Sequence, residues 1–136
     1  MNDFIVWDKC RKVWIDESYP FFINSRGFLC IQRNDKQMVI ENDCEIFKSL
    51  GLTDIKSKSI YADSSIVEFK MMINKEEVVI KGYFSYIEEE LRHEFYQYFD
   101  QRQSFIKAFL SPRDSRITEK FKIIDTIQEN KLGLIK

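Results

Sequence analysis

Residues 66–87 read IVEFKMMINKEEVVIKGYFSYI, and this stretch decides the fold class of the protein. Residues 66–71 and 77–87 carry β-branched and aromatic side chains interleaved with charged ones, which is typical of β-strands. Between these two runs, Ile73-Asn74-Lys75-Glu76 contains the polar residues that favour a turn. The sequence therefore predicts two strands joined by a turn, within a mainly β protein.

The N-terminal part of the chain shows the same alternation in shorter runs. Residues 21–23 and 27–31 flank the turn-like tripeptide Asn24-Ser25-Arg26, which predicts a hairpin. A further apolar run follows at residues 38–40. We therefore expect residues 1–49 to form an N-terminal β-module, a meander of about four or five short strands.

The composition changes between residues 50 and 65. The stretch LGLTDIKSKSIYADSS contains one glycine, four serines and few apolar residues. It predicts a segment that connects two modules and is not itself a packed element. We expect residues 66–130 to form the second module and residues 131–136 to form a tail.

For two segments of the second module, the sequence pattern is compatible with either a helix or a strand. In residues 88–99, apolar side chains recur every four residues behind three glutamates, which suits a helix, but the same residues also fit one face of a strand. In residues 104–110 the apolar spacing of three to four suits a helical turn. Pro112 ends any regular element, and alternation at residues 121–126 predicts a last strand.

The composition excludes several classes of protein. The chain has 136 residues, of which 44% are hydrophobic and 32% charged, and this excludes an intrinsically disordered chain. Its 21 basic and 22 acidic side chains leave a net charge of −1, so the whole chain is not a polyphosphate binder. The length suits one domain or two small modules.

Residues that usually carry catalysis or bind metals are few. Cys10, Cys30 and Cys44 are an odd number without a CxxC pair, which argues against a disulfide framework and a zinc site. His93 is the single histidine, and no phosphate-binding glycine motif occurs. Glu88-Glu89-Glu90 fits a solvated surface better than a metal site, because consecutive acids point in different directions. We predict no catalytic residue, no cofactor, no metal and no enzymatic activity.

The sequence also bears on localisation. The N-terminus lacks the basic start and apolar run of a signal peptide. No apolar stretch approaches the roughly 20 residues that a membrane helix needs. We therefore expect a cytoplasmic protein without a membrane partner.

The aromatic content exceeds what a core of this size needs. The chain has twelve Phe, six Tyr and two Trp, and rings fall at both parities of their segments, so both faces carry them. Because aromatic side chains are enriched at the centres of protein interfaces, we expect a homo-oligomer or a protein partner. The candidate interface residues are Trp7, Trp14, Tyr83, Phe84, Tyr86, Tyr96 and Tyr98.

Basic side chains near these rings leave an alternative open. Lys9, Arg11 and Lys12 lie near the two tryptophans, and cations beside aromatic rings can hold single-stranded nucleic acid. The near-zero net charge disfavours this function but does not remove it.

Three separated motifs resemble the YopX family of small phage and prophage proteins. The family pattern TGLKDKNGKEIYEGDIV is similar to Leu50-Gly51-Leu52-Thr53-Asp54, Lys58-Ser59-Ile60-Tyr61 and Ile66-Val67-Glu68-Phe69. The family's first and last strands resemble FIVWDK at residues 4–9 and FKIIDTIQEN at residues 121–130. The chain departs from the pattern at Ser57, where the family has a loop glycine.

The resemblance implies a β-rich N-terminal module followed by a small SH3-like β-barrel, with a tendency to multimerise. It implies that residues 91–99 form a barrel strand, and it brings no catalytic residue or cofactor. We therefore expect a non-enzymatic accessory protein of a phage or prophage in the host cytoplasm, which self-associates and binds a host or phage protein. The alternatives are a nucleic-acid-binding module that uses the barrel face, and a small-molecule or nucleotide-binding counter-defence protein.

Overall fold

The computed structural model describes residues 4–15, 21–23, 26, 29–32, 38–40 and 44–135. Within these residues the chain consists mainly of antiparallel β-strands, and its single helix is a 3₁₀ turn at Glu88–Glu90. The predicted mainly β fold with few or short helices is therefore confirmed.

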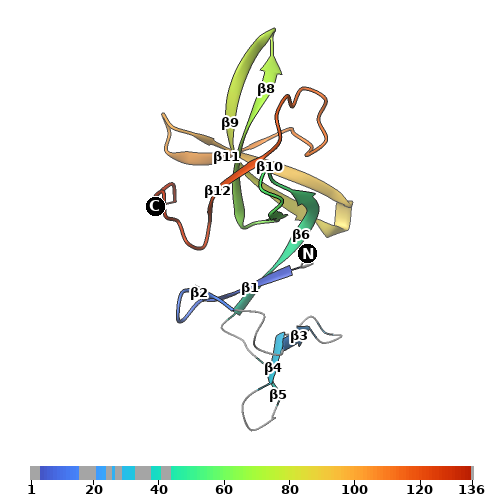
Figure 1. Ribbon diagram of the computed structural model, residues 1–136, viewed down its shortest axis with the longest axis vertical. Helices are drawn as coiled ribbons and strands as arrows, with labels where there is room; N and C mark the ends of the chain where they lie inside the picture. Colours follow the sequence, from blue (N-terminus) through green and yellow to red (C-terminus); the bar gives the residue numbers. More distant parts are fainter. Residues whose placement is uncertain are drawn as a thin grey trace.

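A five-stranded sheet forms the larger part of the described chain (Figure 1). Its strands are β8 (Ser65–Ile73), β9 (Glu76–Ile87), β10 (Arg92–Phe99), β11 (Ser104–Ala108) and β12 (Lys122–Thr126). They lie in the order β11-β10-β9-β8-β12, and the sheet curls into a partial barrel. Every neighbouring pair is antiparallel, so short connections can link most of the strands.

The hairpin of β8 and β9 has the turn that the sequence predicts. Ile73 pairs with Glu76, and Asn74 and Lys75 form the two-residue loop between them. Both loop residues have positive φ, at 51° and 68°. This conformation is typical of a type I′ turn, whose twist matches that of the two strands.

Four phenylalanines form the centre of the core, three from different strands and Phe121 from the residue just before β12. Phe69 contacts Phe95 and Phe121, with ring centroids 5.7 and 4.8 Å apart. Phe84 contacts the same two rings at 4.8 and 5.6 Å, so the four rings form a closed cycle. Such tilted and edge-to-face contacts stabilise aromatic pairs by roughly 0.5–1.5 kcal/mol beyond the burial of their area. The aliphatic residues around them are Ile60, Val67, Met71 and Ile80.

At Gly82 there is no room for a side chain between β9 and β10. This glycine pairs with Gln97 on β10 and with Val67 on β8. A Cβ atom at this position would lie 2.2 Å from the Tyr96 carbonyl oxygen and 2.5 Å from Cζ of Phe95. Only glycine fits here without displacing its neighbours, and the Phe95 ring occupies the space that a side chain would take.

The N-terminal half contains two smaller sheets. The first has the order β2-β1-β6-β7, and the second has the order β3-β4-β5. Their strands are β1 (Phe4–Asp8), β2 (Val13–Trp14), β3 (Phe21–Ile23), β4 (Leu29–Gln32), β5 (Met38–Ile40), β6 (Cys44–Thr53) and β7 (Ser59–Tyr61). The predicted hairpin of residues 21–31 is present as β3 and β4, although Asn24 and Ser25 of its turn lie outside the described residues. The expected meander is present only in part, because β1 pairs with β6 from the far end of this half.

The segment at residues 50–65 is packed, so our expectation of an unpacked connection was wrong. Strand β6 continues to Thr53, β7 follows, and Ile60 is 1% exposed in the core. The buried carboxylate of Asp54 holds the loop between these strands. It accepts hydrogen bonds from the N–H groups of Lys56 and Lys58, each at 2.9 Å.

The helical turn considered for residues 104–110 is also wrong, because residues 104–108 form β11. Tyr98 of β10 lies opposite Phe105, and Phe95 lies opposite Ala108. The three-to-four spacing does not reflect a helix, because Phe105 and Ile106 are successive residues of a strand and face opposite sides of the sheet. In contrast, the strand that the family resemblance implies at residues 91–99 is present as β10.

We predict that Gly82→Ala lowers the free energy of unfolding by about 3 kcal/mol, because the added methyl group must displace backbone of β10 or the Phe95 ring. Urea unfolding followed by circular dichroism measures the change. Gly51→Ala is the matched control. Its Cβ would meet no atom within 4 Å, so only the cost of positive φ, about 1 kcal/mol, remains. Equal losses in the two variants would contradict the steric account.

Candidate functional site

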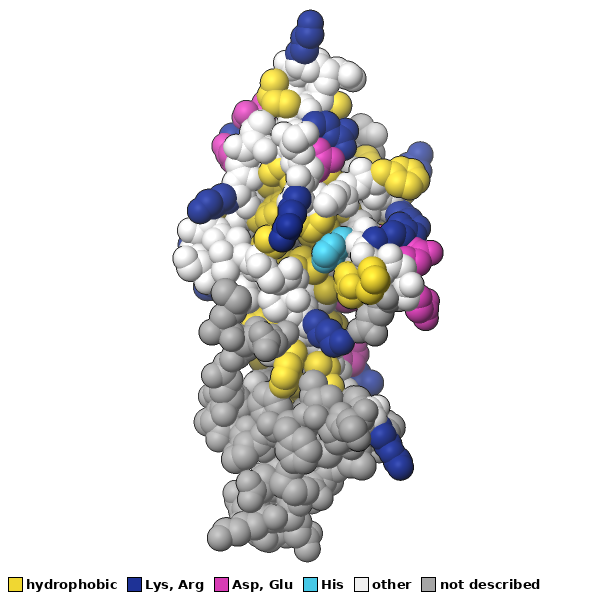
Figure 2. Space-filling model, turned by 90° about the vertical axis from the view of Figure 1, so that its right-hand side faces the viewer, with side chains coloured by type: hydrophobic (Ala, Val, Ile, Leu, Met, Phe, Trp, Pro, Cys, Tyr) yellow, Lys and Arg dark blue, Asp and Glu magenta, His cyan; other side chains and the backbone are white. Residues whose placement is uncertain are grey.

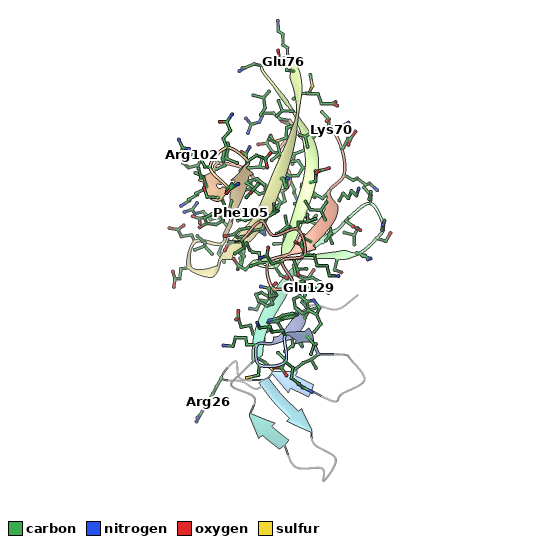
Figure 3. The ribbon with its side chains drawn as sticks, turned by 90° about the vertical axis from the view of Figure 1, so that its left-hand side faces the viewer. Arg26, Lys70, Glu76, Arg102, Phe105 and Glu129 are labelled. Atoms are coloured by element: carbon green, nitrogen blue, oxygen red, sulfur yellow. The ribbon has the colours of Figure 1, made fainter. Side chains whose placement is uncertain are left out.

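Four aromatic rings gather on the side of β9, β10 and β11 that faces away from the core. We name this set, Tyr83, Tyr96, Tyr98 and Phe105, the outer aromatic face. Its members alternate along the strands with core residues, since Phe84 and Phe95 point to the other side. Figure 3 shows Phe105 on β11, at the margin of the five-stranded sheet.

The rings of the outer aromatic face contact one another across three strands. Tyr83 and Tyr96 are cross-strand partners and stack with centroids 5.1 Å apart at 16°. Phe105 contacts the rings of Tyr83 and Tyr98, each at 5.1 Å. All four side chains are partly exposed, so the cluster is an ordered apolar surface beside solvent.

A buried carboxylate controls the charge of this face. Glu94 is 6% exposed and accepts hydrogen bonds from Lys107 at 2.7 Å, Arg92 at 3.1 Å and the Tyr96 hydroxyl at 3.0 Å. The hydrogen bond from Lys107 is the main cause that holds the pKa of Glu94 below its ordinary value. The same carboxylate raises the pKa of Tyr96, which therefore stays a neutral donor at physiological pH. The cations beside the rings are thus neutralised in part.

One cation lies directly against the aromatic rings. The Lys81 ammonium is 5.4 Å from the centre of the Tyr98 ring, which is a cation–π distance. Burial raises the pKa of Tyr83, with further contributions from Tyr96 and Asp63. The face therefore presents neutral rings with Lys81 in cation–π contact, and this arrangement suits binding better than proton transfer.

Tyr86 lies apart from the outer aromatic face, beside His93 in a groove of about 500 Å³. The groove is lined by β6 residues 46–50, by Ala62 and Asp63, and by these two rings, whose centroids are 5.1 Å apart. Figure 2 shows the histidine among apolar side chains on this side of the molecule. Burial and the charge of Arg113 lower the pKa of His93, so its imidazole is neutral at physiological pH.

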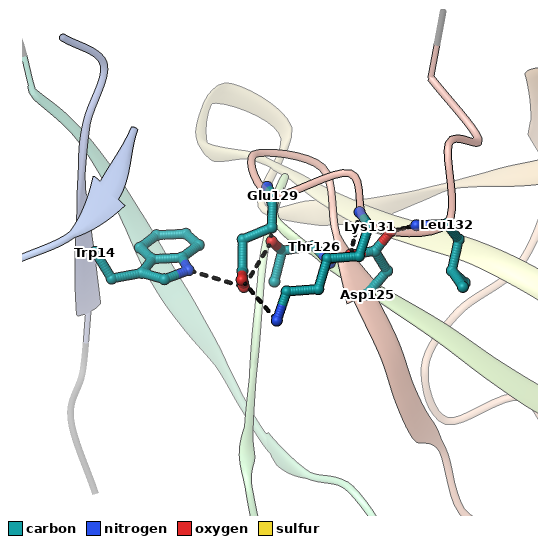
Figure 4. Close-up of polar contacts among 6 residues, drawn as sticks. All are labelled: Trp14, Asp125, Thr126, Glu129, Lys131 and Leu132. Atoms are coloured by element: carbon teal, nitrogen blue, oxygen red, sulfur yellow. Dashed lines mark hydrogen bonds and ion pairs between the residues drawn. The ribbon is translucent and has the colours of Figure 1, made fainter. Parts of the chain in front are cut away.

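Trp7 and Trp14 lie in the joint between the N-terminal sheet and the C-terminal residues. Their rings are cross-strand partners with centroids 4.8 Å apart, and Trp14 also contacts Phe47 at 6.1 Å. The Trp14 Nε1 group donates a hydrogen bond of 3.0 Å to the carboxylate of Glu129 (Figure 4).

The C-terminal residues are in turn tied to the five-stranded sheet. The Asp125 carboxylate accepts hydrogen bonds from the backbone N–H groups of Thr126, Lys131 and Leu132, at 2.8, 3.1 and 2.9 Å. Glu129 pairs with Lys131 at 3.0 Å and accepts a hydrogen bond from the Thr126 hydroxyl. Figure 4 shows that Glu129 connects this network to the Trp14 indole. It connects the two halves of the described chain through polar contacts.

The structure therefore divides the predicted interface residues into four groups. Tyr83, Tyr96 and Tyr98 share the outer aromatic face, Tyr86 lines the groove, and Trp7 and Trp14 lie in the joint. Phe84 is 1% exposed within the core, so its ring is not at the surface.

Sequence reasoning did not include Phe105 and Lys81 in the site. The apolar spacing around Phe105 suits a helical turn, whereas the alternation of a strand places Phe105 beside Tyr98. Lys81 lies two residues before Tyr83 on β9, so the alternation of a strand predicts that both side chains lie on the outer side.

Within the described residues, no group of three or more His, Cys, Asp or Glu side chains is placed to hold a metal ion. Of Glu88-Glu89-Glu90, Glu90 pairs with Arg92. No helix in the described part of the chain is long and apolar enough to cross a membrane. Comparisons with protein families, with curated proteins and with solved structures find no match for this chain.

We predict that the charge of Glu129 stabilises the joint in a pH-dependent way. The hydrogen bond from Trp14 lowers the pKa of Glu129 in the folded protein. The ionised carboxylate therefore contributes its full stabilisation above the ordinary pKa of glutamate, and this stabilisation is lost as the pH falls through the pKa of Glu129 in the folded protein. Glu129→Gln should cost about 1 kcal/mol at pH 7, and this difference from the wild type should shrink near pH 3.

Urea unfolding of both proteins at the two pH values measures the difference. Glu119→Gln is the control, because Glu119 is half exposed, pairs with Lys70 at 3.3 Å and should contribute little at either pH. A loss for Glu129→Gln that is the same at both pH values would show that the carboxylate charge is not what holds the joint.

Proposed function

We propose that this chain is a non-enzymatic accessory protein of phage or prophage type, which acts in the cytoplasm of a bacterial host. Its resemblance to the YopX family supports the phage origin. In this proposal the protein self-associates and binds a host or phage protein through the outer aromatic face. The observation that carries the proposal is the cluster of four rings, joined by three ring contacts, on the solvent side of β9, β10 and β11.

The energetics of this face favour association with another apolar surface. Removing apolar area from water contributes about 25 cal/mol per Å², and large rings provide much of that area at interfaces. The rings already hold one another in place, so little side-chain entropy is lost when a partner covers them. Because Glu94 neutralises nearby cations, few uncompensated charges have to leave water.

One observation favours a second function, the binding of single-stranded nucleic acid. Lys81 lies over the Tyr98 ring, and a lysine beside an exposed ring is how β-rich modules hold both a phosphate and a stacked base. This binding would weaken steeply with salt, because it releases counterions. Association through apolar rings would change little with salt.

We expect light scattering on a gel-filtration peak to give a mass well above 16.4 kDa at both low and high salt. Phe105→Ala should weaken self-association at least tenfold, because it removes the ring that contacts both Tyr83 and Tyr98. Phe99→Ala is the matched control. Phe99 is 38% exposed on β10 and pairs with Ser104, and it faces the side opposite to Tyr98, so its loss should leave the mass unchanged.

A strict monomer at high micromolar concentration would contradict self-association. If that monomer bound oligonucleotides with steep salt dependence, and Lys81→Ala weakened the binding, the nucleic-acid function would replace the first proposal. Equal effects of Phe105→Ala and Phe99→Ala would contradict the assignment of the interface to this face.

A further inference from the structure

The two margins of the five-stranded sheet differ in how their backbone groups are used. At the β12 margin, the Phe121 carbonyl accepts a hydrogen bond of 2.9 Å from the Ile55 N–H group. The Ile123 N–H group donates to the Asp54 carboxylate at 3.4 Å. The part of β8 beyond β12 is also covered, because Met71 forms a bridge with Ile117. This margin is therefore closed by the protein's own loops.

Strand β11 forms the other margin and has only β10 as a neighbour among the described strands. An edge strand of this kind offers a row of backbone donors and acceptors to another strand. Its pairing with β10 is regular over five residues, from Ser104 to Ala108, so no bulge twists the edge away. Phe109, directly after the strand, is 94% exposed.

The single charge on β11 does not block this edge. Lysines on edge strands usually prevent pairing by reaching into solvent beside the strand. Here the Lys107 ammonium lies over the sheet and pairs with Glu94 at 2.7 Å. Among the described residues no strand other than β10 pairs with β11, so its outer edge can receive an incoming strand.

We propose that β11 pairs antiparallel with β11 of a second copy of this chain, about a two-fold axis at Ile106. This inference rests on the proposed self-association and specifies its geometry. The paired strands join the two sheets edge to edge, so that the two outer aromatic faces lie on the same side. In this pairing Phe105 of each copy lies along the seam, and Tyr83, Tyr96 and Tyr98 of both copies remain available to a further protein partner.

The sequence of β11 favours its own copy as the occupant. A five-residue strand pairs with itself along its whole length only when its central residue, Ile106, lies opposite its copy. In this register, Phe105 faces Lys107 and Ser104 faces Ala108. Opposed residues share a face of the sheet, so each lysine meets an aromatic ring and no like charges face each other. The strand is therefore self-complementary in charge.

The register gives a direct test by cysteine cross-linking of the full chain. At the two-fold axis, the Cα atoms of Ile106 and its copy would lie about 4.5–5.5 Å apart, which suits a disulfide. The Cα atoms of the two Ser104 residues would lie roughly 14 Å apart, beyond the reach of a disulfide. Ile106→Cys and Ser104→Cys are therefore a matched pair on one strand.

Under mild oxidation, Ile106→Cys should form a covalent dimer at least tenfold faster than Ser104→Cys. Peptide mapping of the disulfide between the two introduced thiols separates this product from any that involves the native cysteines. A second variant, Ile106→Lys, places like charges opposite each other and should lower the mass seen by light scattering. Val79→Lys, at a 56% exposed position on β9, should leave that mass unchanged.

The outcomes distinguish this inference from the proposed function. An oligomer in which Ile106→Cys forms no disulfide between its introduced thiols, or in which Ser104→Cys forms one equally fast, overturns the β11 pairing and leaves self-association in place. A strict monomer of the wild type overturns both. Rapid cross-linking of Ile106→Cys together with a lower mass for Ile106→Lys supports both.

Discussion

The close approach of β9 and β10 at Gly82 is the constraint on which the five-stranded sheet depends. The missing side chain lets the Phe95 ring lie against the backbone of β9, and this ring belongs to the closed cycle of four phenylalanines. Because Gly82 also pairs with β8, it fixes the relative position of the three central strands. Gly82 therefore links the packing of the Phe95 ring to the pairing of the three central strands.

The same register gives the sheet its two aromatic sides. When Phe84 and Phe95 point into the core, Tyr83 and Tyr96 must point outward, because side chains alternate along a strand. The inner rings stabilise the fold by burial. The outer rings stack beside solvent, and the Tyr96 hydroxyl among them donates a hydrogen bond to Glu94. A shift of one residue in the pairing of β9 and β10 would exchange these roles. Fold and candidate site therefore depend on one register.

The N-terminal half is joined to this sheet by a different kind of contact. The Trp14 indole donates to Glu129, and Asp125 anchors the C-terminal residues through three backbone N–H groups. The bond from Trp14 links residues that are far apart in the sequence, whereas the Asp125 bonds are local to the C-terminal residues. All of them join polar groups that would otherwise lose water on burial. Trp7 and Trp14 thus take part in contacts within the chain, and their place at an interface with another molecule stays a prediction.

The sequence by itself determined the mainly β class and the turn at Asn74 and Lys75, because alternation and turn residues are local signals. It also indicated that rings occupy both faces of β9. Only the tertiary structure decided that residues 104–108 form a strand, since the apolar spacing of this segment fits either conformation until β10 supplies its hydrogen bonds. Likewise, only the packing of distant strands separated Phe84 in the core from Tyr83, Tyr96 and Tyr98 outside, and added Phe105 to them. Burial depends on which strands become neighbours, and these contacts are not encoded within any single segment.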